Sequence, residues 1–172
     1  MKSLFVAVRA LLYSTGFVLL WGWLAVSALR YDAVLGVGLP TVLRHVGIVV
    51  AALGALLCLS CIGTFVVQGR GTPFPLDPPV VVVPTGPYRY VRNPMYIGGA
   101  AVLAGYGLFE GSVSVLMLSV GFLLIMHLFV VMLEEPGLEQ RFGPSYAAYK
   151  QAVNRWLPRF PRQQTPVVPF AP

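Results

Sequence analysis

Two short segments hold most of the side chains in this sequence that could take part in chemistry. Residues 85–98, TGPYRYVRNPMYIG, bring tyrosines, arginines and an asparagine together, and the adjacent glutamates Glu134 and Glu135 follow later in the chain. Tyrosine or arginine taken singly is explained by anchoring at a membrane interface. The glutamate pair is less easily explained, because like charges at a membrane boundary repel each other and the anionic surface. It therefore indicates a cationic partner.

The composition indicates an integral membrane protein. Of the 172 residues, 57% are hydrophobic and only 10% are charged, whereas soluble domains carry about a quarter charged residues. The net charge of +6 favours membrane lipids with anionic headgroups over nucleic acid, because the basic residues lie between and after apolar stretches. Cys58 and Cys61 lie inside an apolar run without further cysteine or a nearby histidine, so we predict packing residues and no metal site.

Four apolar segments are long or apolar enough to be predicted as membrane helices. A hydrocarbon core of about 30 Å needs about 20 helical residues. The first segment could also be a signal peptide, but it is too long and lacks a clear cleavage pattern. The third is short and rich in glycine. The predicted spans are 4–29, 45–67, 95–109 and 113–133.

The remaining segments are predicted to lie outside the bilayer core. Residues 68–94 contain prolines that forbid a continuous helix, and a tight turn at 110–112 joins the last two spans. In the tail, 134–172, the residues Tyr146, Tyr149, Val153 and Trp156 recur at helical spacing and predict an amphipathic helix on the membrane surface. Within the second span, small residues about four apart predict close helix packing. They are Gly47, Ala51, Ala55 and Cys58.

The predicted fold class is therefore an all-α integral membrane protein, a single domain over 1–172. It has about four membrane-spanning helices, with five as the alternative, a cytoplasmic cofactor pocket and a C-terminal amphipathic helix. Under this topology, Arg30 and Arg44 lie on one side and the other ten basic residues lie on the opposite side. The excess of positive charge places both termini in the cytoplasm. The 68–94 loop and the glutamate pair then share that face.

Two sequence blocks resemble a known superfamily. They are residues 86–98, GPYRYVRNPMYIG, and the pattern Glu134-Glu135-x-x-Leu-x-x-x-Phe-Gly-x-x-Tyr-x-x-Tyr-x-x-x-Val-x-Arg-x-x-Pro158. Both closely resemble the isoprenylcysteine carboxyl methyltransferase and phospholipid methyltransferase superfamily, and together they cover about the second half of the chain. The resemblance implies S-adenosylmethionine as methyl donor, with S-adenosylhomocysteine as product, bound at the cytoplasmic end of the helical hairpin.

The resemblance also implies which residues act. A carboxylate can accept hydrogen bonds from the ammonium and ribose hydroxyls of this cofactor, tyrosine faces can stabilise its sulfonium, and adenine needs an apolar slot. By motif position, the cofactor-binding residues are Val80, Val81, Val82, Val83, Tyr88, Asn93, Pro94, Met95, Tyr96 and Glu134. The catalytic candidates are Tyr96, Asn93 and Glu135.

The sequence departs from the superfamily pattern at two positions. Asn93 replaces the usual histidine, and because an amide does not titrate, it excludes a general base there. Val130 replaces an arginine that can meet the substrate carboxylate in the prenylcysteine branch, so prenylcysteine is not the predicted acceptor. His127 lies seven residues before Glu134, on the same face of an α-helix. It could line a substrate channel with Val130, or it could be a helix-packing residue.

The predicted function is S-adenosylmethionine-dependent methyl transfer to a lipidic or membrane-partitioned acceptor. The location is a bacterial inner membrane or the endoplasmic reticulum. One alternative is a sterol-reductase-like membrane enzyme that uses NADPH, against which the glutamate pair argues. Another is an inert membrane adaptor of the same fold.

Overall fold

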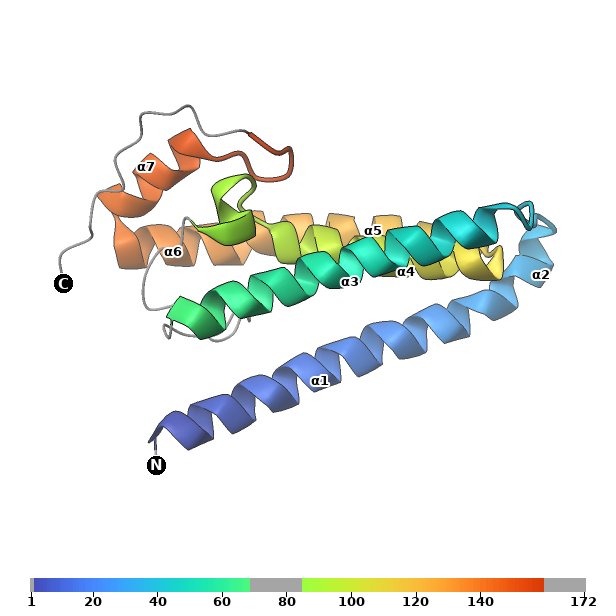
Figure 1. The fold of residues 1–172 in the computed structure, drawn as a ribbon, viewed down its shortest axis with the longest axis horizontal. Coiled ribbons are helices and arrows are strands. Elements are labelled where there is room, and N and C mark those ends of the chain that lie inside the picture. The colour runs from blue at the N-terminus through green and yellow to red at the C-terminus, as the bar shows by residue number, and fades with distance from the viewer. Residues whose placement is uncertain (1, 69–84, 160–172) are drawn as a thin grey trace.

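The computed structural model describes residues 2–68 and 85–159, and these form an antiparallel arrangement of helices. The long helices are α1 (Lys2–Ala28), α3 (Leu43–Gln68), α4 (Pro94–Glu110) and α5 (Val113–Phe129). Successive helices run in opposite directions along the molecule (Figure 1). Within the described residues there is no strand, only an isolated bridge between Gly38 and Ser112. The predicted all-α membrane fold is confirmed.

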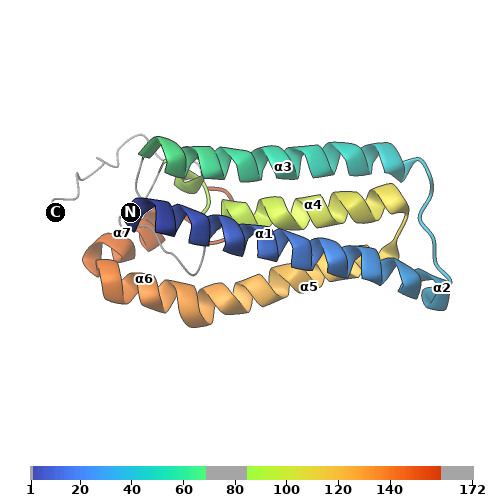
Figure 2. The same cartoon turned by 90° about the horizontal axis from the view of Figure 1, so that it is seen from below.

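Short elements gather at the two ends of the long helices. One end carries η1 (Leu29–Tyr31), α2 (Asp32–Leu35) and the α4–α5 turn. The other end carries η2, η3, α6 and α7, and it is where the chemistry-bearing segments lie (Figure 1). A continuous rod joins α5, η3 and α6 (Figure 2). The bounds at this end are Gly86–Arg89 for η2, Val130–Glu134 for η3, Glu135–Phe142 for α6 and Pro144–Ala152 for α7.

Among the described residues, three helical stretches are long and apolar enough to cross a membrane. They are Thr15–Leu35, Leu43–Thr64 and Val113–Phe142. The third predicted segment forms α4, whose 17 residues extend about 25 Å at ~1.5 Å per residue, slightly less than the bilayer core. This helix packs against both α3 and α5. Large apolar side chains on the outer helix faces are exposed, as expected where lipid replaces water.

Close contact between α3 and α4 depends on glycine. A Cβ built on Gly47 would lie 2.6 Å from the Gly105 carbonyl oxygen, and one on Gly54 would lie 2.6 Å from that of Gly98. The predicted small-residue stripe is therefore correct in kind but wrong at one position. Ala55 is exposed, and Gly54 faces α4 in its place.

Capping groups hold the opposite end of the bundle. Ser112 is the N-cap of α5, and its hydroxyl accepts a hydrogen bond from the Val115 amide at 3.0 Å. A carboxylate oxygen of Asp32 accepts a second from the Ser114 amide at 2.9 Å. Amides at a helix start have no partner within the helix. Asp32 of α2 therefore supplies a hydrogen-bond acceptor to the first turn of α5.

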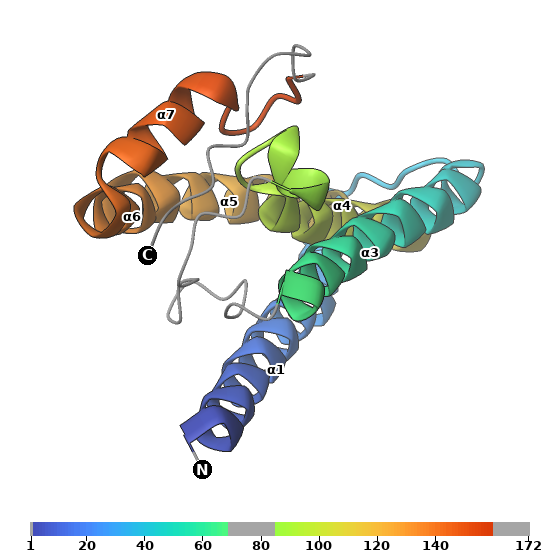
Figure 3. The same ribbon diagram turned by 60° about the vertical axis from the view of Figure 1, so that its left-hand side comes forward.

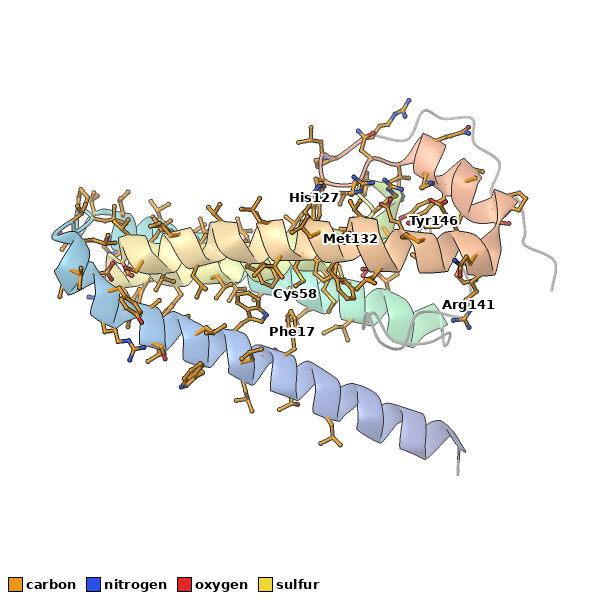
Figure 4. All side chains as sticks on the ribbon, turned by 180° about the vertical axis from the view of Figure 1, so that it is seen from behind. Phe17, Cys58, His127, Met132, Arg141 and Tyr146 are labelled. Carbon is orange, nitrogen blue, oxygen red and sulfur yellow. The ribbon has the colours of Figure 1, made fainter. Side chains whose placement is uncertain are left out.

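Helix α1 diverges from the other long helices toward its N-terminus (Figure 3). Near its C-terminal half it packs against α5 through aromatic rings. Trp21 meets Phe122 edge-on with ring centroids 4.7 Å apart, and Phe17 lies 6.1 Å from the same ring. Figure 4 shows Phe17 projecting from α1 toward the α5 rod.

The C-terminal region differs from the sequence prediction in two ways. The helical rod does not stop at residue 133 but continues through the π-helical η3 and α6 to Phe142. The predicted amphipathic helix is α7, which ends at Ala152, because Val153 is extended with φ −126° and ψ 128°. Trp156 therefore lies beyond the helix that the spacing predicts.

Gly105→Ala should destabilise the protein by about 1 to 3 kcal/mol, because the new methyl group would meet the backbone of α3. Gly121→Ala is the matched control, since a Cβ built at Gly121 meets nothing within 4 Å. The stability of both variants is compared through the midpoint of thermal unfolding of the purified proteins in detergent. Equal midpoints for the two variants would contradict the close α3–α4 approach.

Candidate active site at the end of the α5 rod

Glu135 is buried and surrounded by cations. Its carboxylate accepts paired hydrogen bonds from Arg155, from Nε to Oε1 and from Nη2 to Oε2, each at 2.8 Å. Arg92 contributes a further contact, from Nη2 to Oε1 at 3.2 Å. The exposed fraction of the Glu135 side chain is 8% and that of Arg92 is 9%. The hydrogen bond with Glu135 also raises the pKa of Arg155 above its ordinary value. Both oxygens of Glu135 are therefore occupied.

Glu134 differs from its neighbour in its surroundings. It is half-buried, and its Oε2 accepts a hydrogen bond from the Tyr96 hydroxyl at 2.9 Å. In the part of the chain that the structure describes, no lysine or arginine forms an ion pair with it. The described residues also contain no cluster of histidine, cysteine or carboxylate side chains able to hold a metal ion. The Tyr96 phenol therefore orients the Glu134 carboxylate.

Residues 153–159, here called the C-terminal strap, cross the turn that precedes α4. The Arg92 amide donates to the Asn154 carbonyl at 2.9 Å, and the Asn93 side-chain amide donates to the Arg155 carbonyl at 3.3 Å. Further along, the Arg159 amide donates to the Tyr90 carbonyl at 2.8 Å. The strap and the Glu135 ion pairs therefore hold this turn against the rod.

Trp156 of the strap extends the site along α5. Its indole Nε1 donates to His127 Nδ1 at 3.0 Å. The Trp156 ring centroid lies 6.0 Å from that of His127 and 6.5 Å from that of Tyr96. A continuous row of side chains therefore runs from the junction of η3 and α6 back along α5. Its members are Glu134, Tyr96, Trp156 and His127.

Buried tyrosines support the site from α7. The Tyr149 hydroxyl donates to the Tyr88 carbonyl at 2.7 Å, and Tyr146 is buried. Burial raises the pKa of both α7 tyrosines and of Tyr88 well above the ordinary phenol value. These phenols stay protonated at neutral pH, so they cannot serve as general bases there.

The structure brings together most of the predicted site residues. Tyr96, Asn93, Glu134, Glu135 and His127 lie within one network of contacts. Pro94 and Met95 occupy the first turn of α4, where the Met95 carbonyl accepts from the Cys58 thiol at 3.6 Å. Val130 is buried in the hydrophobic core at 1% exposure. The residues Val80, Val81, Val82 and Val83 lie outside the described residues.

Sequence reasoning missed the residues that complete this network. Arg92, Arg155 and Trp156 all stand inside or beside the recognised blocks, but the pattern gave no sign of which carboxylate each would meet. It also assumed a regular α-helix from His127 to Glu134. The π-helical η3 lies between them, and because its hydrogen bonds span five residues, seven residues no longer complete two full turns.

Comparison with known proteins identifies the family. Residues 42–145, from the start of α3 to the beginning of α7, match the phospholipid methyltransferase family. The chain belongs to this family. A 63-residue uncharacterized protein of Haemophilus influenzae (strain Rd) is 35% identical over its entire length, which corresponds to 37% of this chain. As a member of the phospholipid methyltransferase family, the chain is an integral membrane methyltransferase, and its strap lies beyond the matched residues.

Glu135→Gln should lower the free energy of unfolding by about 3 kcal/mol, because it leaves two buried or half-buried guanidinium groups without a counter-charge. Glu139→Gln is the control, since its ion pair with Lys150 is partly exposed and should contribute less than about 1 kcal/mol. Thermal unfolding in detergent compares the variants. A Glu135→Gln protein as stable as the control would show that the ion pairs do not hold the strap.

Proposed function

We propose that the protein transfers a methyl group from S-adenosylmethionine to a lipidic amphiphile at the cytoplasmic face of the membrane. The observation that supports this most strongly is that two adjacent carboxylates have different hydrogen-bond partners. Glu135 is neutralised by Arg92 and Arg155, whereas Glu134 is held by Tyr96 without a basic partner among the described residues. A carboxylate that no lysine or arginine of the described residues neutralises suits a cationic ligand.

The methyl donor has the charges that this site would accept. Its ammonium can bind the Glu134 carboxylate in a charge-assisted hydrogen bond. Its sulfonium can lie against an aromatic face. The Tyr96 hydroxyl bonds to Glu134, and the Trp156 ring centroid lies 6.5 Å from that of Tyr96. Glu134 and Tyr96 are therefore proposed as donor-binding residues, with Asn93 fixed beside them by the strap.

Glu135 has a different proposed role from the one that the resemblance implies. Because both of its oxygens are engaged by arginines, it is a positioning residue that holds the strap, and not a base. Asn93 cannot take up a proton at neutral pH, and the buried α7 phenols remain protonated. The site therefore suits an acceptor that arrives already nucleophilic.

The proposed step is a direct displacement. A lone pair of the acceptor forms a bond to the methyl carbon while the carbon–sulfur bond breaks, and its electron pair passes to sulfur, which becomes the neutral thioether of S-adenosylhomocysteine. A neutral amine acceptor becomes a cationic methylammonium group. Where its nitrogen still carries a hydrogen, that proton is released to water. The protein contributes proximity and alignment. An amphiphile reaches the site from the bilayer along the membrane-spanning part of α5.

Glu134→Gln should weaken S-adenosylhomocysteine binding about tenfold or more, since a hydrogen bond to a charged group contributes about 1.5 to 3 kcal/mol. Calorimetric titration of the purified protein measures this affinity, with Glu110→Gln at the opposite end of α4 as a matched control. A parallel titration with NADPH tests the reductase alternative. Binding of NADPH alone, or equal affinities of wild type and Glu134→Gln for S-adenosylhomocysteine, would refute the proposed donor site.

The proposed orientation predicts opposite accessibility at the two ends of the bundle. Gln140 is exposed on α6, and Thr41 is exposed in the segment before α3. In intact cells, a membrane-impermeant thiol reagent should label Thr41→Cys and spare Gln140→Cys, since the arginine-rich end should face the cytoplasm. Labelling of Gln140→Cys alone would reverse the proposed orientation.

A further inference from the structure

The hydrogen bond between Trp156 and His127 fixes where the histidine carries its proton. An indole N–H can only donate, so His127 Nδ1, at 3.0 Å from Trp156 Nε1, must be the acceptor. In a neutral imidazole, the proton then resides on Nε2. The ring consequently presents an N–H donor on the side opposite the strap.

That donor lies at membrane depth. His127 belongs to the span Val113–Phe142 and is half-buried, and exposed apolar side chains flank it at Leu124 and Leu128. The described residues provide no hydrogen-bond partner for its Nε2. Figure 4 shows His127 on the same side of the rod as Tyr146 of α7. An N–H group in apolar surroundings is stabilised only if something accepts from it.

We propose that His127 Nε2–H donates a hydrogen bond to an ester carbonyl oxygen of an acyl-lipid acceptor. This inference rests on the proposed function. The seven residues from His127 to Glu134 correspond to about 10 Å along the rod, so the donor lies deeper in the membrane than the methyl-transfer site. A glycerophospholipid has the same order, because its ester carbonyls lie several bonds deeper than the headgroup. His127 is thus a specificity residue for the acceptor's glycerol region.

The first experiment compares two lipids that differ only at the proposed contact. The full-length protein receives radiolabelled S-adenosylmethionine and either dioleoylphosphatidylethanolamine or its diether analogue, which lacks the ester carbonyls. Wild type should show a KM about fivefold lower for the diester, the effect of one neutral hydrogen bond. His127→Leu should lose this preference with kcat unchanged, and His127→Gln, which keeps an N–H donor, should recover part of it.

The second experiment needs no turnover. Histidine-selective ¹⁵N NMR in a His45→Gln background should show His127 protonated on Nε2 only, and Trp156→Phe should allow both tautomers. In the presence of S-adenosylhomocysteine, the diester lipid should shift the Nε2–H resonance and the diether should not. This titration tests the contact between His127 and the ester carbonyl even if neither lipid is methylated.

The results separate this inference from the donor site. Calorimetry on His127→Leu should give the wild-type affinity for S-adenosylhomocysteine. A wild type that does not bind S-adenosylhomocysteine refutes the proposed function. Three results would overturn the role of His127. They are protonation of His127 on Nδ1, equal KM values and equal resonance shifts for the two lipids, and a His127→Leu defect confined to kcat.

Discussion

The buried carboxylate of Glu135 is the interaction on which this end of the bundle depends. Its side chain is more than nine-tenths buried, and a carboxylate so buried remains charged only where cations surround it. Segments that are distant in the sequence must therefore supply those cations. Arg92 reaches it from the turn before α4, and Arg155 reaches it from the strap beyond α7. The ion pairs also bring backbone groups into register, so that the Asn93 side chain and the Arg92 amide bond to the strap. One buried charge thereby organises the whole end of the bundle.

The same arrangement explains why two adjacent glutamates can have different roles. Successive residues on a helix point in directions that differ by about 100°, so Glu134 and Glu135 face different neighbours. Both arginines lie on the side of Glu135, and Tyr96 lies on the side of Glu134. The π-helical turn η3 ends at this pair, and such turns often occur at functional sites. Among the described residues, the arginines that reach this pair bind Glu135, and Glu134 is bound by the Tyr96 phenol.

The sequence predicts the parts of this structure that depend on local pattern. The lengths of the apolar segments and the turn at 110–112 are sufficient to predict the helical hairpin of α4 and α5. The order of the two sequence blocks is sufficient to predict the family. Long-range choices are not encoded locally. Helical spacing is equally compatible with Ala55 or Gly54 against α4, and only the opposing glycines of α4 decide between them. Likewise, Val153 and Trp156 continue the helical period although the helix ends at Ala152, because tertiary bonds of the strap replace helical ones.

The strap separates what the family match covers from what it does not. The match ends at residue 145 and includes Tyr96, Asn93 and the glutamate pair, while Arg155 and Trp156 lie beyond it. Through Arg155 the strap binds Glu135, and through Trp156 it donates a hydrogen bond to Nδ1 of a histidine within the span. With an amide at residue 93, the turn before α4 contains no histidine. The Trp156–His127 hydrogen bond connects the strap with the membrane-spanning part of α5, and we propose that acceptor selectivity arises there.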